Sequence, residues 1–145
     1  MNKGEFLHLL QGELALANRD EAEKVAICVL GTLANRLTTE EAENVEAQLP
    51  EGIKAMWRGN LGNVLRHRLE GAQKFSREDF VAHVVDDLKV PQDRAIALIE
   101  GVFTVLKHQI TPGLADHLQS QLPKGLRVMW LESKPVEEVG PPRRI

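Results

Sequence analysis

The chain has 145 residues, of which 43% are hydrophobic and 27% charged, with 18 Lys and Arg side chains against 21 Asp and Glu and a single cysteine. This balance predicts one compact soluble domain and excludes extensive disorder, because a chain of this length and apolar content can bury a sizeable core. The lone cysteine excludes a disulfide scaffold. The first residues lack the apolar core of a secretion signal, and no apolar run reaches the roughly 18 residues of a membrane span, so we expect a cytoplasmic protein.

The sequence contains an internal repeat. Residues 48–57, Gln-Leu-Pro-Glu-Gly-Ile-Lys-Ala-Met-Trp, match residues 121–130, Gln-Leu-Pro-Lys-Gly-Leu-Arg-Val-Met-Trp, at six of ten positions and at an offset of 73. Upstream of Asp20 the offset becomes 74, which pairs Phe6 with Phe80. Self-similarity at a fixed period indicates that one structural unit occurs twice.

Apolar residues of the first repeat recur at helical spacing. Phe6, Leu10 and Leu14 are four apart, which predicts a first helix with one apolar stripe. A second, longer helix is expected to begin at Asp20, whose carboxylate would accept from free backbone N–H groups while Glu23 reaches back in a capping box.

Two shorter helices complete the first repeat. The third helix is expected to begin at Thr38 and to end before Pro50, because proline cannot continue a helix. A short fourth helix follows. Its predicted buried face consists of Ile53, Met56 and Trp57.

The second repeat predicts the same four helices. Its long helix is expected to begin at Asp93, and the next helix at Thr111, followed by Pro112 at the first helical position, where a missing N–H costs nothing. Pro123 is expected to start the last helix. The long helices of both repeats carry wide apolar arcs, so we expect them to lie at the centre of the bundle.

The predicted fold class is all-α. Residues 1–131 are expected to form a single domain, a tandem duplication of a three-to-four-helix unit, with repeats 1–57 and 77–130 packed as one pseudo-twofold bundle. Two copies are too few for a solenoid, which favours such closure. Residues 58–76 form a partly helical connector, and residues 132–145, which contain three prolines, predict a flexible tail.

Several local sequences are specific to the repeat. The long helix of the first repeat ends in residues 33–38, Leu-Ala-Asn-Arg-Leu-Thr, and Gln-Leu-Pro occurs at 48–50 and again at 121–123. Over about residues 4–131 this pattern resembles the bacterial family known as domain of unknown function 2267. The resemblance implies an all-helical duplicated fold in a bacterial cytoplasm. It implies no activity, because the family has no established catalytic or binding residues.

An acidic and histidine patch is the strongest candidate for chemistry. Asp79, His83 and Asp87 are four apart and would share one helix face, so one imidazole and one or two carboxylates could hold a divalent ion. The alternative is a solvated helix face, since zinc sites normally need three or four ligands. No metal or other cofactor is therefore assigned to the chain.

The connector is the one strongly basic stretch, with four basic side chains against Glu70. It could meet phosphate or an acidic partner, or it could be an ordinary solvated segment. The absence of interleaved aromatic residues argues against nucleic acid. The basic patch consists of Arg58, Arg66, His67, Arg68 and Lys74.

The repeated Met-Trp pairs have two interpretations. Met56 and Trp57, with Met129 and Trp130, could anchor the short helices in the core, or they could line an adaptable hydrophobic groove for a partner helix or an apolar ligand. Cys28 is expected to be a small packed hydrophobe rather than a nucleophile, because no histidine is near it in sequence.

The leading hypothesis is a non-catalytic module for protein interaction or self-association, with a protein partner or a homo-oligomer and no membrane. The reason for this hypothesis is that the sequence predicts a symmetric scaffold and contains no catalytic motif. The alternative is a carrier of small apolar ligands with a cavity between the repeats. A third hypothesis is metal-dependent activity at the Asp79, His83 and Asp87 patch.

Overall fold

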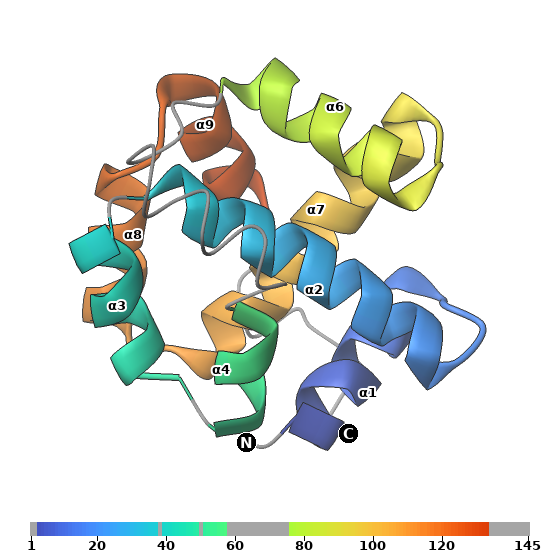
Figure 1. The fold of residues 1–145 in the computed structure, drawn as a ribbon, viewed down its shortest axis with the longest axis horizontal. Helices are drawn as coiled ribbons and strands as arrows, with labels where there is room; N and C mark the ends of the chain where they lie inside the picture. The colour runs from blue at the N-terminus through green and yellow to red at the C-terminus, as the bar shows by residue number, and fades with distance from the viewer. Residues whose placement is uncertain (1–2, 38, 50, 58–75, 134–145) are drawn as a thin grey trace.

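The computed structural model describes residues 3–37, 39–49, 51–57 and 76–133. Within these ranges the chain forms helices and no strand, which confirms the all-α class (Figure 1). The helices are α1 (Lys3–Leu14), α2 (Arg19–Arg36), α3 (Thr39–Ala47), α4 (Glu51–Trp57), α6 (Arg77–Leu88), α7 (Gln92–Gln109), α8 (Pro112–Ser120) and α9 (Lys124–Glu132).

The helices before and after residues 58–75 follow in the same order, with equal lengths in three of the four pairs. α1 and α6 each have 12 residues, α2 and α7 have 18, α3 and α8 have 9, while α4 has 7 and α9 has 9. A residue with left-handed backbone follows both α1 and α6, namely Ala15 (φ 53°) and Lys89 (φ 57°). The chain therefore turns in the same way after each of these two helices.

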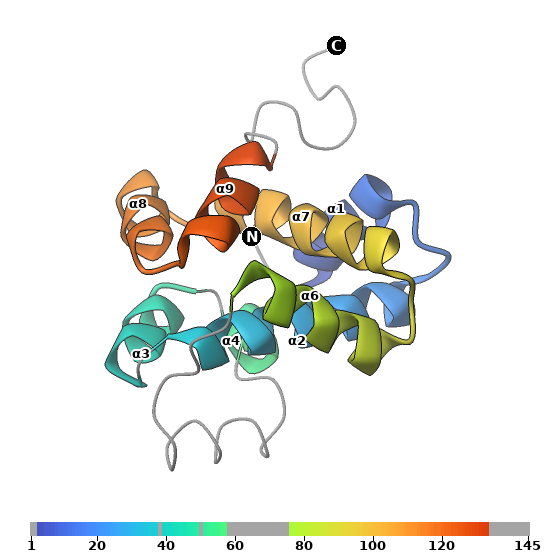
Figure 2. The same ribbon diagram turned by 90° about the horizontal axis from the view of Figure 1, so that it is seen from above.

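The helices form two layers (Figure 2). α7, α8 and α9 lie in one layer, with α1 at the level of α7, and α2, α3 and α4 lie in the other, with α6 at the level of α2. α1 packs against both α2 and α7, and α6 packs against both α7 and α2. Each of these two helices therefore packs against helices from both halves of the chain.

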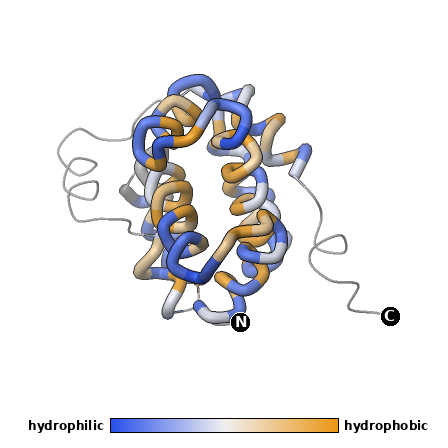
Figure 3. The backbone as a smooth tube through the Cα atoms, turned by 90° about the vertical axis from the view of Figure 1, so that its right-hand side faces the viewer, coloured by the Kyte–Doolittle hydropathy of each residue, from blue (hydrophilic) through white to orange (hydrophobic). Residues whose placement is uncertain are grey.

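The core lies between the layers and is built around α2 and α7, as their apolar arcs predict. α7 packs against α1, α2, α6 and α9, and every residue from Gly101 to Leu106 is buried. Buried hydrophobic residues from all the described helices join one cluster. Viewed end-on, the two layers face each other, and hydrophobic segments occur in both (Figure 3).

The long helices begin two residues earlier than the sequence predicts. α2 has Asn18 as its N-cap, with the side-chain Oδ1 accepting from the Glu21 backbone N–H at 2.9 Å, so Asp20 lies inside the first turn. Glu23 closes no capping box with Asp20; its carboxylate accepts from the Lys3 ammonium at 2.8 Å and links α2 to α1. In the second half the N-cap is Pro91 rather than Asp93.

The predicted starts of the two short helices in the second half are confirmed. Thr111 caps α8 by accepting from the Leu114 N–H at 3.2 Å, with Pro112 at the first helical position, and Pro123 is the N-cap of α9. The corresponding positions of the first half, Thr38 and Pro50, lie outside the described residues.

Candidate functional site

The Met-Trp pairs lie in the core and not along a groove. Met56, Trp57, Met129 and Trp130 are each at most 2% exposed. The Trp57 indole Nε1 donates to the Ala42 carbonyl at 3.1 Å and so fastens α4 to α3. Of the two sequence interpretations, the structure supports the anchoring one, because a ligand could not reach these side chains without opening the bundle.

Trp130 sits in an aromatic and cationic environment that fixes α9. The Phe103 ring lies 5.2 Å from it, centroid to centroid, and Phe80 packs edge-on against Phe103. The Lys107 ammonium lies 5.4 Å from the Trp130 ring centroid and donates to the carbonyls of Trp130 at 2.8 Å and Ser133 at 3.2 Å. Lys107 therefore holds the carbonyl groups at the end of α9.

Burial lowers the pKa of Lys107 from its ordinary value. Ser133 is itself 5% exposed, and its hydroxyl donates to the Trp130 carbonyl at 2.6 Å. Of the tail predicted over residues 132–145, Glu132 ends α9 and Ser133 belongs to the folded body, while the rest lies outside the described residues.

The opposite side of α9 faces solvent and carries apolar side chains. Val128 is 45% exposed and Leu131 57% exposed, and in the described part of the chain these are the large hydrophobic residues that remain exposed. Charged residues surround them. We call this side the α9 outer face, and it consists of Lys124, Arg127, Val128, Leu131 and Glu132, all exposed.

The described residues of the first half contain no equivalent of this surface. At the offset of 73, Ala55 occupies the position of Val128 and Lys54 that of Arg127. The position equivalent to Leu131 is residue 58, outside the described residues. The apolar pair is therefore a property of α9 and not a requirement of the repeated unit.

The predicted metal patch is not assembled. The Asp79 carboxylate accepts from the Ser76 N–H at 3.3 Å, and the Ser76 hydroxyl accepts from the Asp79 N–H at 3.1 Å, a capping box that starts α6. His83 also has an interaction partner. Across the described residues no three His, Cys, Asp or Glu side chains come together as a metal ion would require.

Cys28 packs on a second buried face of α2, against α6. It is 5% exposed, and the hydroxyl of Thr32 donates to its backbone carbonyl at 2.6 Å. Burial, reinforced by contact with the Asp87 carboxylate, raises the pKa of the Cys28 thiol above its ordinary value. The thiol therefore stays protonated at neutral pH, which agrees with the expectation of a packed hydrophobe. Asp87, proposed above as a metal ligand, lies beside this thiol.

The basic patch of the connector falls outside the described residues. This applies to Arg58, Arg66, His67, Arg68 and Lys74. The structure therefore leaves that prediction as it stands.

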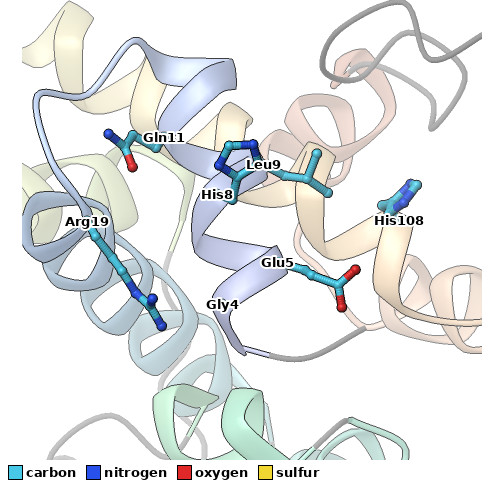
Figure 4. Close-up of a pocket in the computed structure, with 7 residues that line it drawn as sticks. All are labelled: Gly4, Glu5, His8, Leu9, Gln11, Arg19 and His108. Atoms are coloured by element: carbon cyan, nitrogen blue, oxygen red, sulfur yellow. The ribbon is translucent and has the colours of Figure 1, made fainter.

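An open depression of about 520 Å³ lies where α1 meets the start of α2 and the end of α7 (Figure 4). His108 contributes a buried Nδ1 without a hydrogen-bond partner. In the close-up, Glu5 and Leu9 point to the side of His108, whereas Gln11 and Arg19 lie on the other side of α1. The lining side chains do not converge on one point and the depression is open to solvent, so it is not the enclosed cavity that a carrier of small apolar ligands would need. The lining residues are Gly4, Glu5, His8, Leu9, Gln11, Arg19 and His108.

The comparison with protein-family models shows the family to which the chain belongs. A model of an uncharacterised conserved protein family, domain of unknown function 2267, matches residues 3–129. The chain belongs to this family. The comparison with curated proteins found no match. Among the helices that the structure describes, none combines the length and apolar character needed to cross a bilayer.

The sequence pattern identified the buried side of α9 and did not single out its exposed side. Leu126, Met129 and Trp130 form the helical stripe that the pattern identified, and they are buried. Val128 and Leu131 lie off that stripe, on the far side at about 100° per residue. Two large aliphatic residues opposite a complete apolar stripe were the signal that could have revealed the outer face.

Proposed function

We propose that this member of domain of unknown function 2267 is a non-catalytic module for protein association, and that the α9 outer face is its contact surface. The observation that carries the proposal is the exposure of Val128 and Leu131 side by side on one helix. Apolar side chains that lose contact with water on binding supply the main favourable free energy of association.

The fold itself does not call for these two residues. α9 is already anchored through Leu126, Met129 and Trp130, so polar residues on its outer side would leave the core intact. The first half places alanine at the position of Val128 and keeps the same helix. A requirement other than folding is the simplest reason for the apolar pair.

We also propose that the two halves are copies of one unit related by a pseudo-twofold axis. The sequence repeat, the similar helix lengths and the left-handed residues after α1 and α6 support this duplication. So does the reciprocal packing of α1 on α7 and α6 on α2. In this scheme the duplicated fold is the scaffold, and α9 is where the second copy has acquired a surface of its own.

The other hypotheses gain less support from the described residues. The depression at α1 is open and its polar side chains diverge, which does not suit a carrier of apolar ligands. Two of the residues proposed as metal ligands have structural roles, since Asp79 caps α6 and Asp87 contacts Cys28. We retain a cytoplasmic location as part of the proposal, because the buried thiol of Cys28 needs no oxidising compartment.

Sedimentation velocity tests the proposal. The full chain is labelled with a fluorophore and followed at nanomolar concentration in extract from its native source, and unlabelled protein is followed in buffer up to high micromolar concentration. The test variant is Val128→Ser with Leu131→Ser. The control is Ala47→Ser with Ala82→Ser, which changes two exposed apolar positions on α3 and α6.

We expect a larger sedimenting species in at least one arm. The test variant should weaken it by about tenfold or more, because contact residues of this kind dominate interface free energies, while the control should leave it unchanged. Sedimentation as a monomer in both arms would refute the association module. An equal weakening of the complex in the test variant and in the control variant would show that the α9 outer face is not the contact surface.

A further inference from the structure

We propose that the α9 outer face binds a second copy of this chain in a weak, twofold symmetric dimer. This inference rests on the proposed function and names its partner. In such an interface the same patch meets itself, so each residue must face a suitable residue of the identical surface.

The arrangement of charges on α9 meets this condition. At about 100° per residue, Lys124, Val128 and Leu131 run along the middle of the outer face. Arg127 and Glu132 lie on its two opposite flanks, on either side of the line from Val128 to Leu131. All of these residues are exposed.

A twofold axis along the line from Val128 to Leu131 exchanges its two sides. Val128 and Leu131 then each meet their own counterpart in the second copy. Lys124 and Arg127 lie on one side of this line and Glu132 on the other, so the basic side of each copy faces Glu132 of the other, which gives two equivalent charge contacts around an apolar centre. Lys124 lies on the N-terminal side of Arg127 and adds positive charge near the same carboxylate.

This symmetry makes the two α9 helices cross obliquely. A side-by-side antiparallel arrangement is disfavoured, because it would place Arg127 beside Arg127 of the second copy and Glu132 beside Glu132. Arg127 is partly positioned already, since its Nη2 donates to the Leu122 carbonyl at 3.1 Å. The guanidinium has five N–H donors, so others stay available for the carboxylate.

The contact is small. α9 has 9 residues, and two crossed helices of that length bury less than the roughly 1,200 Å² of total area that stable complexes need. The expected dimer is therefore transient, forms at high micromolar concentration and weakens in salt, because its ion pairs lie at a rim open to solvent.

Charge reversal provides a test that does not depend on the wild-type affinity alone. Arg127→Glu replaces a cation that faces Glu132 of the other copy by a carboxylate, while Lys124 remains, and Glu132→Arg sets a guanidinium against Lys124 and Arg127 of the other copy. Each variant should associate with itself more weakly than the wild type does, whereas a mixture of the two restores both charge contacts in a heterodimer. The matched controls are Lys24→Glu on α2 and Glu43→Arg on α3, exposed charges far from α9 in sequence.

The measurement is sedimentation velocity of the full chain from about 10 µM to about 1 mM, a range suited to a contact below the standard interface size. We expect the wild type to dimerise reversibly, each α9 variant alone to have at least a fivefold weaker self-association on the scale of rim charge effects, and the equimolar mixture to recover wild-type association within about twofold. The control variants should behave as wild type. Circular dichroism of each variant checks its helix content.

Two results would overturn the dimer. One is a wild type that stays monomeric at the highest concentration, and the other is a mixture that associates no better than its components. If either occurs while a complex in native extract still requires Val128 and Leu131, the association module stands and its partner is a different protein. If that complex is also missing, both proposals fail.

Discussion

Two glycines at equivalent positions are fixed by a close approach between helices. A Cβ on Gly52, in the first turn of α4, would lie 2.5 Å from Cβ of Lys3, and a Cβ on Gly125, in the first turn of α9, would lie 2.8 Å from Cβ of Arg77. Lys3 and Arg77 are the first residues of α1 and α6. The start of each of these helices therefore rests on a glycine of the short helix in the same half.

Replacing these glycines should destabilise the protein. We expect Gly52→Ala and Gly125→Ala each to lower the free energy of unfolding by about 1–3 kcal/mol, the usual cost of forcing a methyl group into a packed contact. Urea unfolding measures the change. Gly12→Ala in α1 and Gly113→Ala in α8 are matched controls, because nothing lies within 4 Å of the added Cβ.

The controls should be neutral or stabilising by up to about 1 kcal/mol, because alanine favours helix more than glycine does. If Gly52→Ala and Gly125→Ala behaved like these controls, the starts of α1 and α6 could move aside at little cost. The repeat itself shows that a glycine recurs after each Leu-Pro pair. It does not show why, because Lys3 lies far from Gly52 in sequence.

At the scale of single helices, the pattern predicted where helices exist better than where they start. Asp20 and Asp93 looked like caps because each is an acidic residue at the head of an apolar run. The actual caps lie two residues earlier, where Asn18 and Pro91 have extended backbone. An acidic residue stabilises a helix from inside the first turn as well as from the cap, so composition alone does not separate the two positions.

Lys107 connects α7 to the end of α9, and its removal should loosen α9 in particular. We expect Lys107→Met, which keeps an apolar stem, to lower the free energy of unfolding by about 1–2 kcal/mol through the loss of two hydrogen bonds to carbonyls. Hydrogen exchange should rise at the amides of α9 more than at those of α3. Lys24→Met, at an exposed position on α2, is the control.

Unchanged exchange in α9 with a lower global stability would mean that Lys107 contributes only apolar packing against Trp130. The first half has Ala34 at the equivalent position, so no lysine holds the end of α4 in this way. This difference again distinguishes α9 from its counterpart.

At the scale of the whole molecule, the two halves depend on each other. α1 packs against α7 and α6 packs against α2, so either half alone would expose the apolar surface that the other covers. Leu14 illustrates the fit, since its side chain fills the space beside Gly101 of α7, where a Cβ would lie 2.6 Å from a Leu14 methyl.

We therefore expect neither residues 1–57 nor residues 76–145 to fold alone. Far-UV circular dichroism should show each fragment with low helix content and no cooperative thermal transition, and an equimolar mixture should regain helix, because the contacts between the halves are recovered on association. The intact chain is the control. Cooperative unfolding of residues 1–57 alone would show that contacts within one half suffice.

The order of residues is enough to predict the helices, their arrangement in two similar series and the buried sides of the short helices that carry Trp57 and Trp130. These features depend on local periodicity and on burial of apolar stripes, and both can be deduced from the order of residues. The position of α1 against α7 and the exposure of Val128 and Leu131 follow instead from the packing of the helices. Those outcomes depend on which helices become neighbours, and that is settled by the closure of the whole bundle around its core.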